Sequence, residues 1–75
     1  MPPSPHEALS DREFEVMRLL ARGHRVTEIA ETLSLSPKTV STYRRRVLEK
    51  MNMTSNADLV EYAVRENLIT PSSDA

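Results

Sequence analysis

The chain has 75 residues, with 10 basic and 11 acidic side chains and a formal net charge of −1 at pH 7. This length is enough for one small domain, and the lack of cysteine excludes disulfides and thiolate metal sites. His6 and His24 lie far apart without nearby ligand partners, so no metal or other cofactor is expected. No apolar stretch approaches the ~20 residues of a membrane span, and no signal peptide is present, so a cytoplasmic protein with no membrane partner is expected.

The two ends of the chain have the composition of flexible segments. Residues 1–9 contain three prolines and no helical period, which predicts a flexible linker. A chain that starts in a linker is expected to be a domain cut from something longer. Residues 70–75 are polar with a proline and predict a flexible tail. The folded domain is therefore expected to span residues 10–69.

The first two helices are marked by their end signals. Ser10 and Glu13 form an S-x-x-E capping box that predicts the start of the first helix. Gly23, the only glycine, stands where a left-handed C-terminal cap is expected. Apolar residues at helical spacing then predict a second helix over residues 27–33, followed by a turn at residues 34–36.

The third and fourth helices begin with equally clear signals. Ser36 is an expected N-cap and Pro37 fits the first helical position, so a helix is predicted over residues 37–51. Asn52 is the expected C-terminal cap of this helix. A fourth helix is predicted over residues 55–67, and no strand-like alternation appears anywhere in the sequence.

The second and third helices have the spacing of a helix-turn-helix. Ala30 stands at the position where a larger side chain would clash with the following helix. The usual apolar positions of the motif are occupied by Ile29, Leu33, Leu35, Val40 and Tyr43. The expected fold is therefore all-α, a four-helix bundle that contains a helix-turn-helix.

Positive charge is concentrated on the third helix. Between Pro37 and Lys50 there are five basic residues and one acid, a net of +4, while the remainder of the chain has a net of −5. Because a phosphate backbone feels the field within about 10 Å, the local charge matters more than the total. If the apolar side chains point inward, the outward positions are Lys38, Ser41, Thr42, Arg45 and Glu49. This face favours contact with nucleic acid.

The sequence resembles the DNA-binding domain of the LuxR/NarL (FixJ) family of bacterial transcription regulators, which has a tetrahelical fold. The matching segments are residues 9–17, Gly23, and residues 28–30, 33–40 and 47–51. The run Thr-Val-Ser-Thr-Tyr at residues 39–43 resembles the response-regulator branch of the family. In that branch a phosphoacceptor receiver domain precedes the DNA-binding domain, which implies control of this chain by a missing N-terminal receiver.

The resemblance implies a role for each matching side chain. Ser41, Thr42 and Arg45 match positions that read bases in the major groove. Positions that hold phosphates are matched by Thr27, Lys38, Thr39, Tyr43 and Lys50. Arg44 and Arg46 are expected to flank the groove toward phosphates, although Arg44 stands where relatives are often aliphatic.

The expected partners are double-stranded DNA, a second copy of the chain on that DNA, and RNA polymerase. In this family the fourth helix forms a symmetric dimer. The residues expected on its outward stripe, and hence in the dimer interface, are Asp58, Glu61, Tyr62 and Arg65. The alternative for this stripe is a solvated face with an incidental tyrosine.

Three other functions each require a feature that the sequence lacks. A helix-turn-helix that binds only proteins would need an apolar patch on the outer face of the third helix, and Ser41, Thr42 and Arg45 provide none. An enzyme is not expected, because no nucleophile–base pair, carboxylate dyad or glycine-rich phosphate loop is present. RNA binding would need more stacking surface than one phenylalanine and two tyrosines supply.

Overall fold

The structure is a computed structural model that describes residues 4–69. It contains a short 3-10 helix, η1 (Pro5–Ala8), and four α-helices: α1 (Asp11–Ala21), α2 (Val26–Leu33), α3 (Pro37–Lys50) and α4 (Asn56–Arg65). No strand occurs within residues 4–69, so the predicted all-α fold with four helices is confirmed. The predicted tail at residues 70–75 lies outside the described residues. Within the described part, no helix is long and apolar enough to cross a membrane.

The start of α1 is fixed by the capping box that the sequence predicts. The Ser10 hydroxyl accepts a hydrogen bond from the Glu13 amide, and the Glu13 carboxylate accepts one from the Ser10 amide at 2.8 Å. These two bonds satisfy backbone donors that have no partner inside the helix. Gly23 follows α1 with a φ of +93°, a conformation that only glycine adopts without strain.

Left-handed residues end the next two helices. Ser34 has a φ of 57° after α2, and Asn52 has a φ of 57° after α3. At the start of α3 the Ser36 hydroxyl accepts from the Thr39 amide at 3.1 Å. The predicted cap residues Ser36 and Asn52 are thus confirmed. Helix α2 begins at Val26, one residue earlier than predicted.

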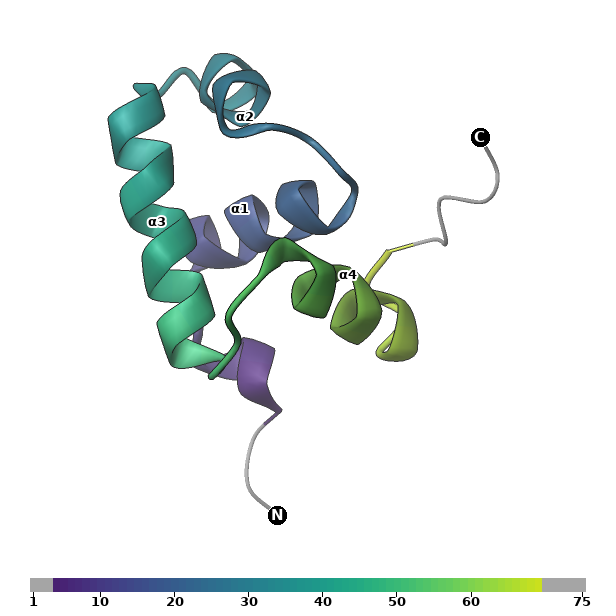
Figure 1. The fold of residues 1–75 in the computed structure, drawn as a ribbon. Helices are drawn as coiled ribbons and strands as arrows, with labels where there is room; N and C mark the ends of the chain where they lie inside the picture. Colours follow the sequence, from purple (N-terminus) through teal and green to yellow (C-terminus); the bar gives the residue numbers. More distant parts are fainter. Residues whose placement is uncertain (1–3, 70–75) are drawn as a thin grey trace.

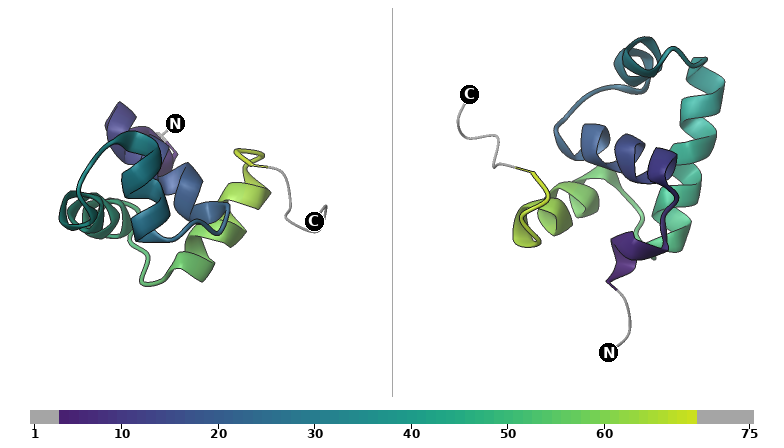
Figure 2. Two further views of the ribbon diagram at one scale, coloured as in Figure 1. Left: turned by 90° about the horizontal axis from the view of Figure 1, so that it is seen from above. Right: turned by 180° about the vertical axis from the view of Figure 1, so that it is seen from behind.

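Helix α1 forms the centre of the domain, and α2, α3 and α4 all pack against it (Figure 1). Helix α2 also packs against α3, and the view from behind shows α1 at the front, with α2 above it, α3 to one side and α4 below (Figure 2). The largest fully buried side chains come from all four helices: Met17, Leu20, Ile29, Leu59, Val16, Val40 and Val47. One side of α3 is thereby fixed to the core, and the opposite side faces outward.

Two further expectations differ from the structure. The segment 1–9 was expected to be a linker without helical structure, but residues 5–8 form η1. The outward position predicted for Tyr62 is wrong, because this residue is only 4% exposed and belongs to the core. Leu59, Tyr62 and Ala63 have the i, i+3, i+4 spacing of one helix face, and α4 packs that face against the domain.

Candidate nucleic-acid interface

The outward side of α3 carries small polar and basic side chains. Lys38, Ser41 and Arg45 are exposed, and Thr42 is half-buried, while Val40 and Val47 are fully buried on the other side. The Thr42 hydroxyl donates to the Lys38 carbonyl oxygen at 3.1 Å, one turn earlier. This bond fixes the Thr42 rotamer. The structure therefore places the three predicted base-reading residues on the same outward side.

The first turn of α3 gathers several hydrogen-bonding groups at the turn of the motif. The Ser36 hydroxyl donates to the Thr39 hydroxyl at 2.9 Å, and both residues are exposed together with Lys38. Thr27 is also exposed, in the first turn of α2. The N-terminal end of a helix carries partial positive charge, so this region favours anions.

The three consecutive arginines of α3 have different surroundings. Arg44 is half-buried, and its Nε donates to the Asn56 side-chain oxygen at 2.9 Å, which connects α3 to the first residue of α4. Arg45 and Arg46 are exposed, and neither forms an ion pair within residues 4–69. Two of the three guanidinium groups therefore have neither an ion pair nor a side-chain hydrogen bond within residues 4–69. Tyr43, beside them, is half-buried and packs against the core.

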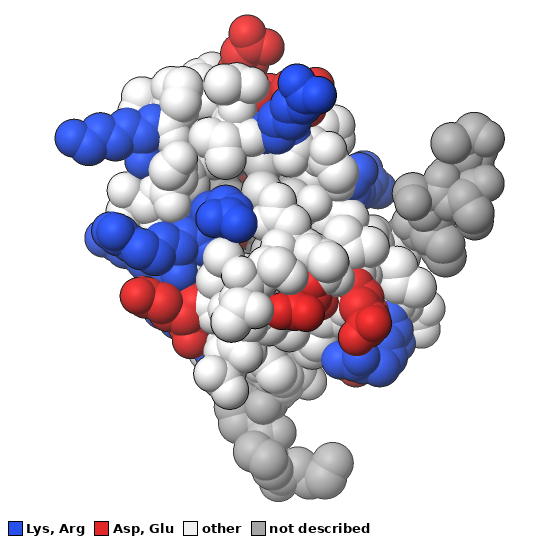
Figure 3. Space-filling model, in the orientation of Figure 1, with Lys and Arg blue, Asp and Glu red and all other residues white. Residues whose placement is uncertain are grey.

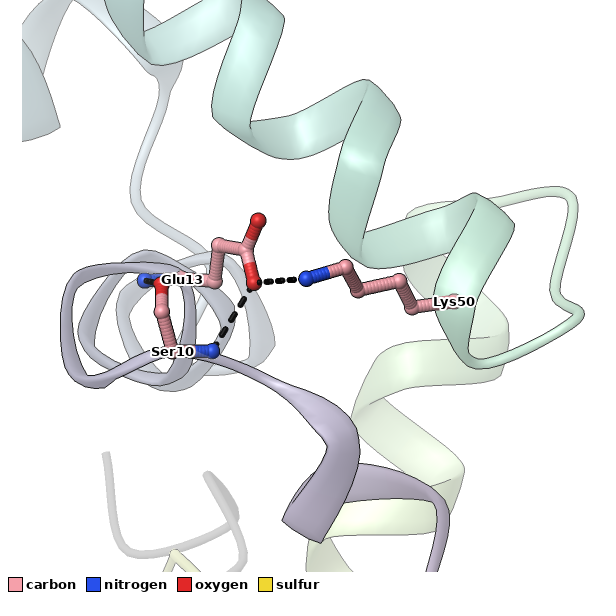
Figure 4. Close-up of polar contacts among 3 residues, drawn as sticks. All are labelled: Ser10, Glu13 and Lys50. Carbon is pink, nitrogen blue, oxygen red and sulfur yellow. Dashed lines mark hydrogen bonds and ion pairs between the residues drawn. The ribbon is translucent and has the colours of Figure 1, made fainter.

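Lys50, a predicted phosphate ligand, is joined to a buried acid. Its Nζ lies 2.8 Å from Oε1 of Glu13, and the same oxygen accepts from the Ser10 amide (Figure 4). The hydrogen bond from Lys50, followed by that from Ser10, lowers the pKa of Glu13 below its ordinary value of 4.5, and burial only partly opposes this effect. The ion pair therefore attaches the end of α3 to the start of α1.

The sequence did not reveal this ion pair, because its two residues are 37 positions apart. Glu13 was recognised as a capping residue, and that function is confirmed. An acid whose capping position lies against the core also needs a cation to compensate its charge. That requirement was the only signal available, and it did not identify Lys50.

The surface shows the positive charge of α3 together with basic side chains of other elements. In Figure 3 several basic side chains lie along the left margin of the molecule, where α3 lies in Figure 1, and others lie at the upper right, the right margin and the lower right. Acidic side chains lie at the top and in the lower half of the same view. Because residues 37–50 carry a net charge of +4, we expect a positive potential along the outward side of α3.

The predicted dimer residues of α4 do not share one environment. Glu61 and Arg65 are exposed, and their charged groups are 3.9 Å apart. The Asp58 carboxylate accepts from the Thr54 amide at 3.2 Å, a bond that lowers the pKa of Asp58. Tyr62 is buried. The structure therefore brings two of the four residues together on the surface. Elsewhere in the described residues, no cluster of three or more acidic, histidine or cysteine side chains could hold a metal ion.

Comparison with known proteins relates this geometry to a function. Residues 7–63 match a family model described as bacterial regulatory proteins, luxR family. The chain is 43% identical over 70 residues to the response regulator GacA of Pseudomonas aeruginosa, which is 93% of this chain and 33% of that protein. It is 43% identical over 65 residues to the response regulator UvrY of Escherichia coli, 87% of this chain and 30% of the relative.

A further relative is the transcription regulator BvgA of Bordetella pertussis, which is 50% identical over 60 residues. That match covers 80% of this chain and 29% of the relative. The chain thus spans about a third of the length of these proteins.

Proposed function

The chain belongs to the luxR family of bacterial regulatory proteins, which bind DNA and regulate transcription, and on this premise we propose that it reads a specific DNA sequence through α3. In this proposal α3 lies in the major groove, and α2 crosses the sugar–phosphate backbone. The observation that carries the proposal is the outward side of α3. It combines small polar side chains with exposed arginines, Arg45 and Arg46, that form no ion pair within residues 4–69, on the helix where the positive charge is concentrated.

Base reading is assigned to Ser41, Thr42 and Arg45. Small side chains at residues 41 and 42 allow the helix backbone to approach the base edges closely. Arg45 follows one turn after Ser41, and an arginine there suits guanine, whose two acceptors match the paired donors of a guanidinium. Arg45 is exposed and has no ion pair among the described residues, so its donors are available.

Phosphate binding is assigned to the groups on either side of these three residues. Lys38 and Arg46 supply charge, and the remaining contacts are assigned to Thr27, Thr39, Tyr43 and Arg44. Arg44 uses one N–H for Asn56, which leaves its other donors for a phosphate. Such contacts fix the register of the protein on the duplex and carry no sequence information themselves.

Lys50 is assigned to a phosphate as well, which requires its ammonium group to contact Glu13 and the phosphate at the same time. One of its N–H donors points to Glu13, and an ammonium has three. Because the Glu13 carboxylate already neutralises this charge, Lys50 contributes less to DNA affinity than Lys38 in this proposal. Its main contribution is to the position of α3.

The proposal includes two copies of the chain on one DNA site, joined through α4. Glu61 and Arg65 are one turn apart and of opposite charge. Across a two-fold axis, Glu61 of one copy would face Arg65 of the other, and Arg65 of the first would face Glu61 of the second.

A receiver domain and RNA polymerase complete the proposal. Two of the relatives are named response regulators and are about three times longer than the match. We place a phosphoacceptor receiver domain before this chain in the full-length protein, within a two-component system of the bacterial cytoplasm. Contact of the DNA-bound dimer with RNA polymerase would convert binding into regulation.

Selection from a random pool of DNA duplexes tests this function. The protein should enrich one sequence that contains two related half-sites, and the enriched set gives the operator, its symmetry and its spacing. The variant in which Ser41, Thr42 and Arg45 are all replaced by alanine is the matched control, and it should enrich nothing. Absence of enrichment by the unaltered protein would contradict DNA reading and favour a helix-turn-helix that binds only proteins.

A further inference from the structure

The short helix η1 is attached to α4 through one histidine. Nδ1 of His6 lies 2.7 Å from the Tyr62 hydroxyl oxygen, and the His6 backbone N–H points to the same oxygen at 3.4 Å. The two rings meet edge to face with their centroids 5.8 Å apart. The His6 ring also lies 5.8 Å from the ring of Phe14 in α1. No residue of η1 is itself buried, so these contacts are what hold it in place.

The hydrogen bonds between His6 and Tyr62 have a defined pattern. The hydroxyl oxygen accepts from the backbone N–H, so its own hydrogen is available for Nδ1. Nδ1 accepts when the imidazole carries its hydrogen on Nε2, and this tautomer satisfies both groups. Replacing either side chain by one without a polar atom therefore removes the bond without leaving a charge behind.

Tyr62 adjoins the exposed charges of α4. The guanidinium carbon of Arg65 lies 5.6 Å from the centroid of the Tyr62 ring. Arg65 has a side-chain exposure of 60%, and Glu61 beside it has 80%. Tyrosine and arginine are the side chains most often at the energetic centre of protein interfaces. The hydroxyl end of such a tyrosine is covered here by His6.

We propose that η1 and a second copy of the chain compete for the surface of α4 around Tyr62. This proposal rests on the self-association through α4 that is part of the proposed function. While His6 holds Tyr62, the segment covers the hydroxyl end of that residue beside Arg65 and Glu61. When η1 leaves, the tyrosine becomes accessible next to a self-complementary charge pair, and a second copy docks there. The N-terminal segment thereby limits dimerisation until it is displaced.

Two substitutions separate the contact from the packing of the core. Tyr62→Phe keeps the buried ring and removes both hydrogen bonds, and His6→Ala removes the partner on η1. His24→Ala is the matched control, because His24 is an imidazole on the α1–α2 turn with 45% side-chain exposure. Amide hydrogen exchange of residues 5–9 measures release of η1, and sedimentation equilibrium measures self-association of the 75-residue chain.

Both test variants should exchange faster at residues 5–9 and associate more tightly than the unaltered chain. Losing one net hydrogen bond shifts the closed-to-open equilibrium by about two- to tenfold, and the dissociation constant should fall by a similar factor. The control should change neither quantity. Adding Glu61→Arg to His6→Ala should abolish the gain, because like charges then meet across the two-fold axis.

Each other outcome overturns a defined part of the proposal. Unchanged exchange would show that His6 does not hold η1. Faster exchange without tighter association would show that η1 does not compete with a second copy. If the unaltered protein showed no sequence-specific DNA binding, the proposed function would be contradicted instead. The hydrogen-exchange result on the contact between His6 and Tyr62 would still hold.

Discussion

At the scale of single residues, the basic side chains of α3 make different contacts and therefore have different functions. Arg44 connects α3 to α4, Lys50 compensates a buried acid, and Arg45 projects from the helix without an ion partner among the described residues. The number of basic residues therefore overstates how much charge is available to DNA. Which residue is available depends on what surrounds it in three dimensions.

Arg45 and Lys38 should give different defects when replaced by alanine. Arg45→Ala should weaken binding to the selected site by about 1–3 kcal/mol and relax the preference at one base pair. Lys38→Ala should weaken binding to all sequences alike and reduce the slope of log affinity against log salt by about one. Fluorescence anisotropy with matched and altered duplexes over a range of salt measures both effects. If Arg45→Ala bound the selected site as tightly as the unaltered protein, Arg45 would not be a base-reading residue.

The Glu13–Lys50 ion pair should stabilise the fold. Glu13→Gln keeps an acceptor for the Ser10 amide but loses the charge that Lys50 contacts at 2.8 Å. Because Lys50 is half-exposed and regains water, the expected loss is modest, about 1–2 kcal/mol of unfolding free energy at pH 7. Urea unfolding measures it. Glu15→Gln is the control, because the exposed Glu15–Arg12 pair should contribute less than about 1 kcal/mol.

The contribution of this pair should also depend on pH. The pKa of Glu13 is lower in the folded chain than its ordinary value of 4.5, so its ionised form stabilises the fold above that pH. As the pH falls below 4.5 and through the lowered pKa, the contribution is lost. The stability difference between the unaltered chain and Glu13→Gln should therefore shrink in acid. A difference that stays constant from pH 7 to pH 3 would show that the ion pair is not its origin.

At the scale of elements, the helix ends are determined by short-range signals. Ser10, Ser36 and Gly23 act within a few residues of their own position, and the structure confirms all three at the expected places. The first residues of α2 and α4 and the last residues of α3 and α4 differ from the prediction by one or two positions, which is the usual uncertainty of helix ends. Local chemistry therefore made the element order predictable from the sequence.

Ser34 offers a stabilising substitution in the turn of the motif. Its φ of 57° costs a residue with a Cβ about 1–2 kcal/mol, and glycine avoids most of this cost. Ser34→Gly should raise the unfolding free energy by about 0.5–1 kcal/mol after the larger entropy of the unfolded glycine is included. Thermal unfolding measures the gain. Ser36→Gly is the contrasting variant, because it removes a cap from an extended residue and should destabilise the domain.

At the scale of the whole molecule, the proposed dimer predicts a DNA site with two half-sites. Two half-sites one helical turn apart, about 10–10.5 base pairs, lie on one face of the duplex. Binding to such a site should be tighter than to a single half-site. Inserting about five base pairs should abolish the gain, because the half-sites then face opposite sides. Equal affinity for both spacings in an electrophoretic mobility assay would contradict a rigid dimer.

The candidate interface was predictable in part. The spacing of the apolar residues of α3 identifies its buried face, and the opposite face is then exposed. This reasoning correctly placed Lys38, Ser41 and Arg45 on the exposed face. The same reasoning failed for Tyr62 on α4, which was expected on the outward side and is buried. Helix α4 packs against α1 with Tyr62 in the core, while Val60 is half-buried.

The sequence by itself determined the four helices, their caps, the helix-turn-helix and the charged side of α3, because each depends on residues a few positions apart. Only the tertiary structure decided which side chains meet across long separations. Glu13 meets Lys50 over 37 positions, and His6 meets Tyr62 over 56. Such contacts depend on the packing of α3 and α4 around α1. Helical periodicity predicts which face of a helix is apolar, but it does not predict which partner that face will contact.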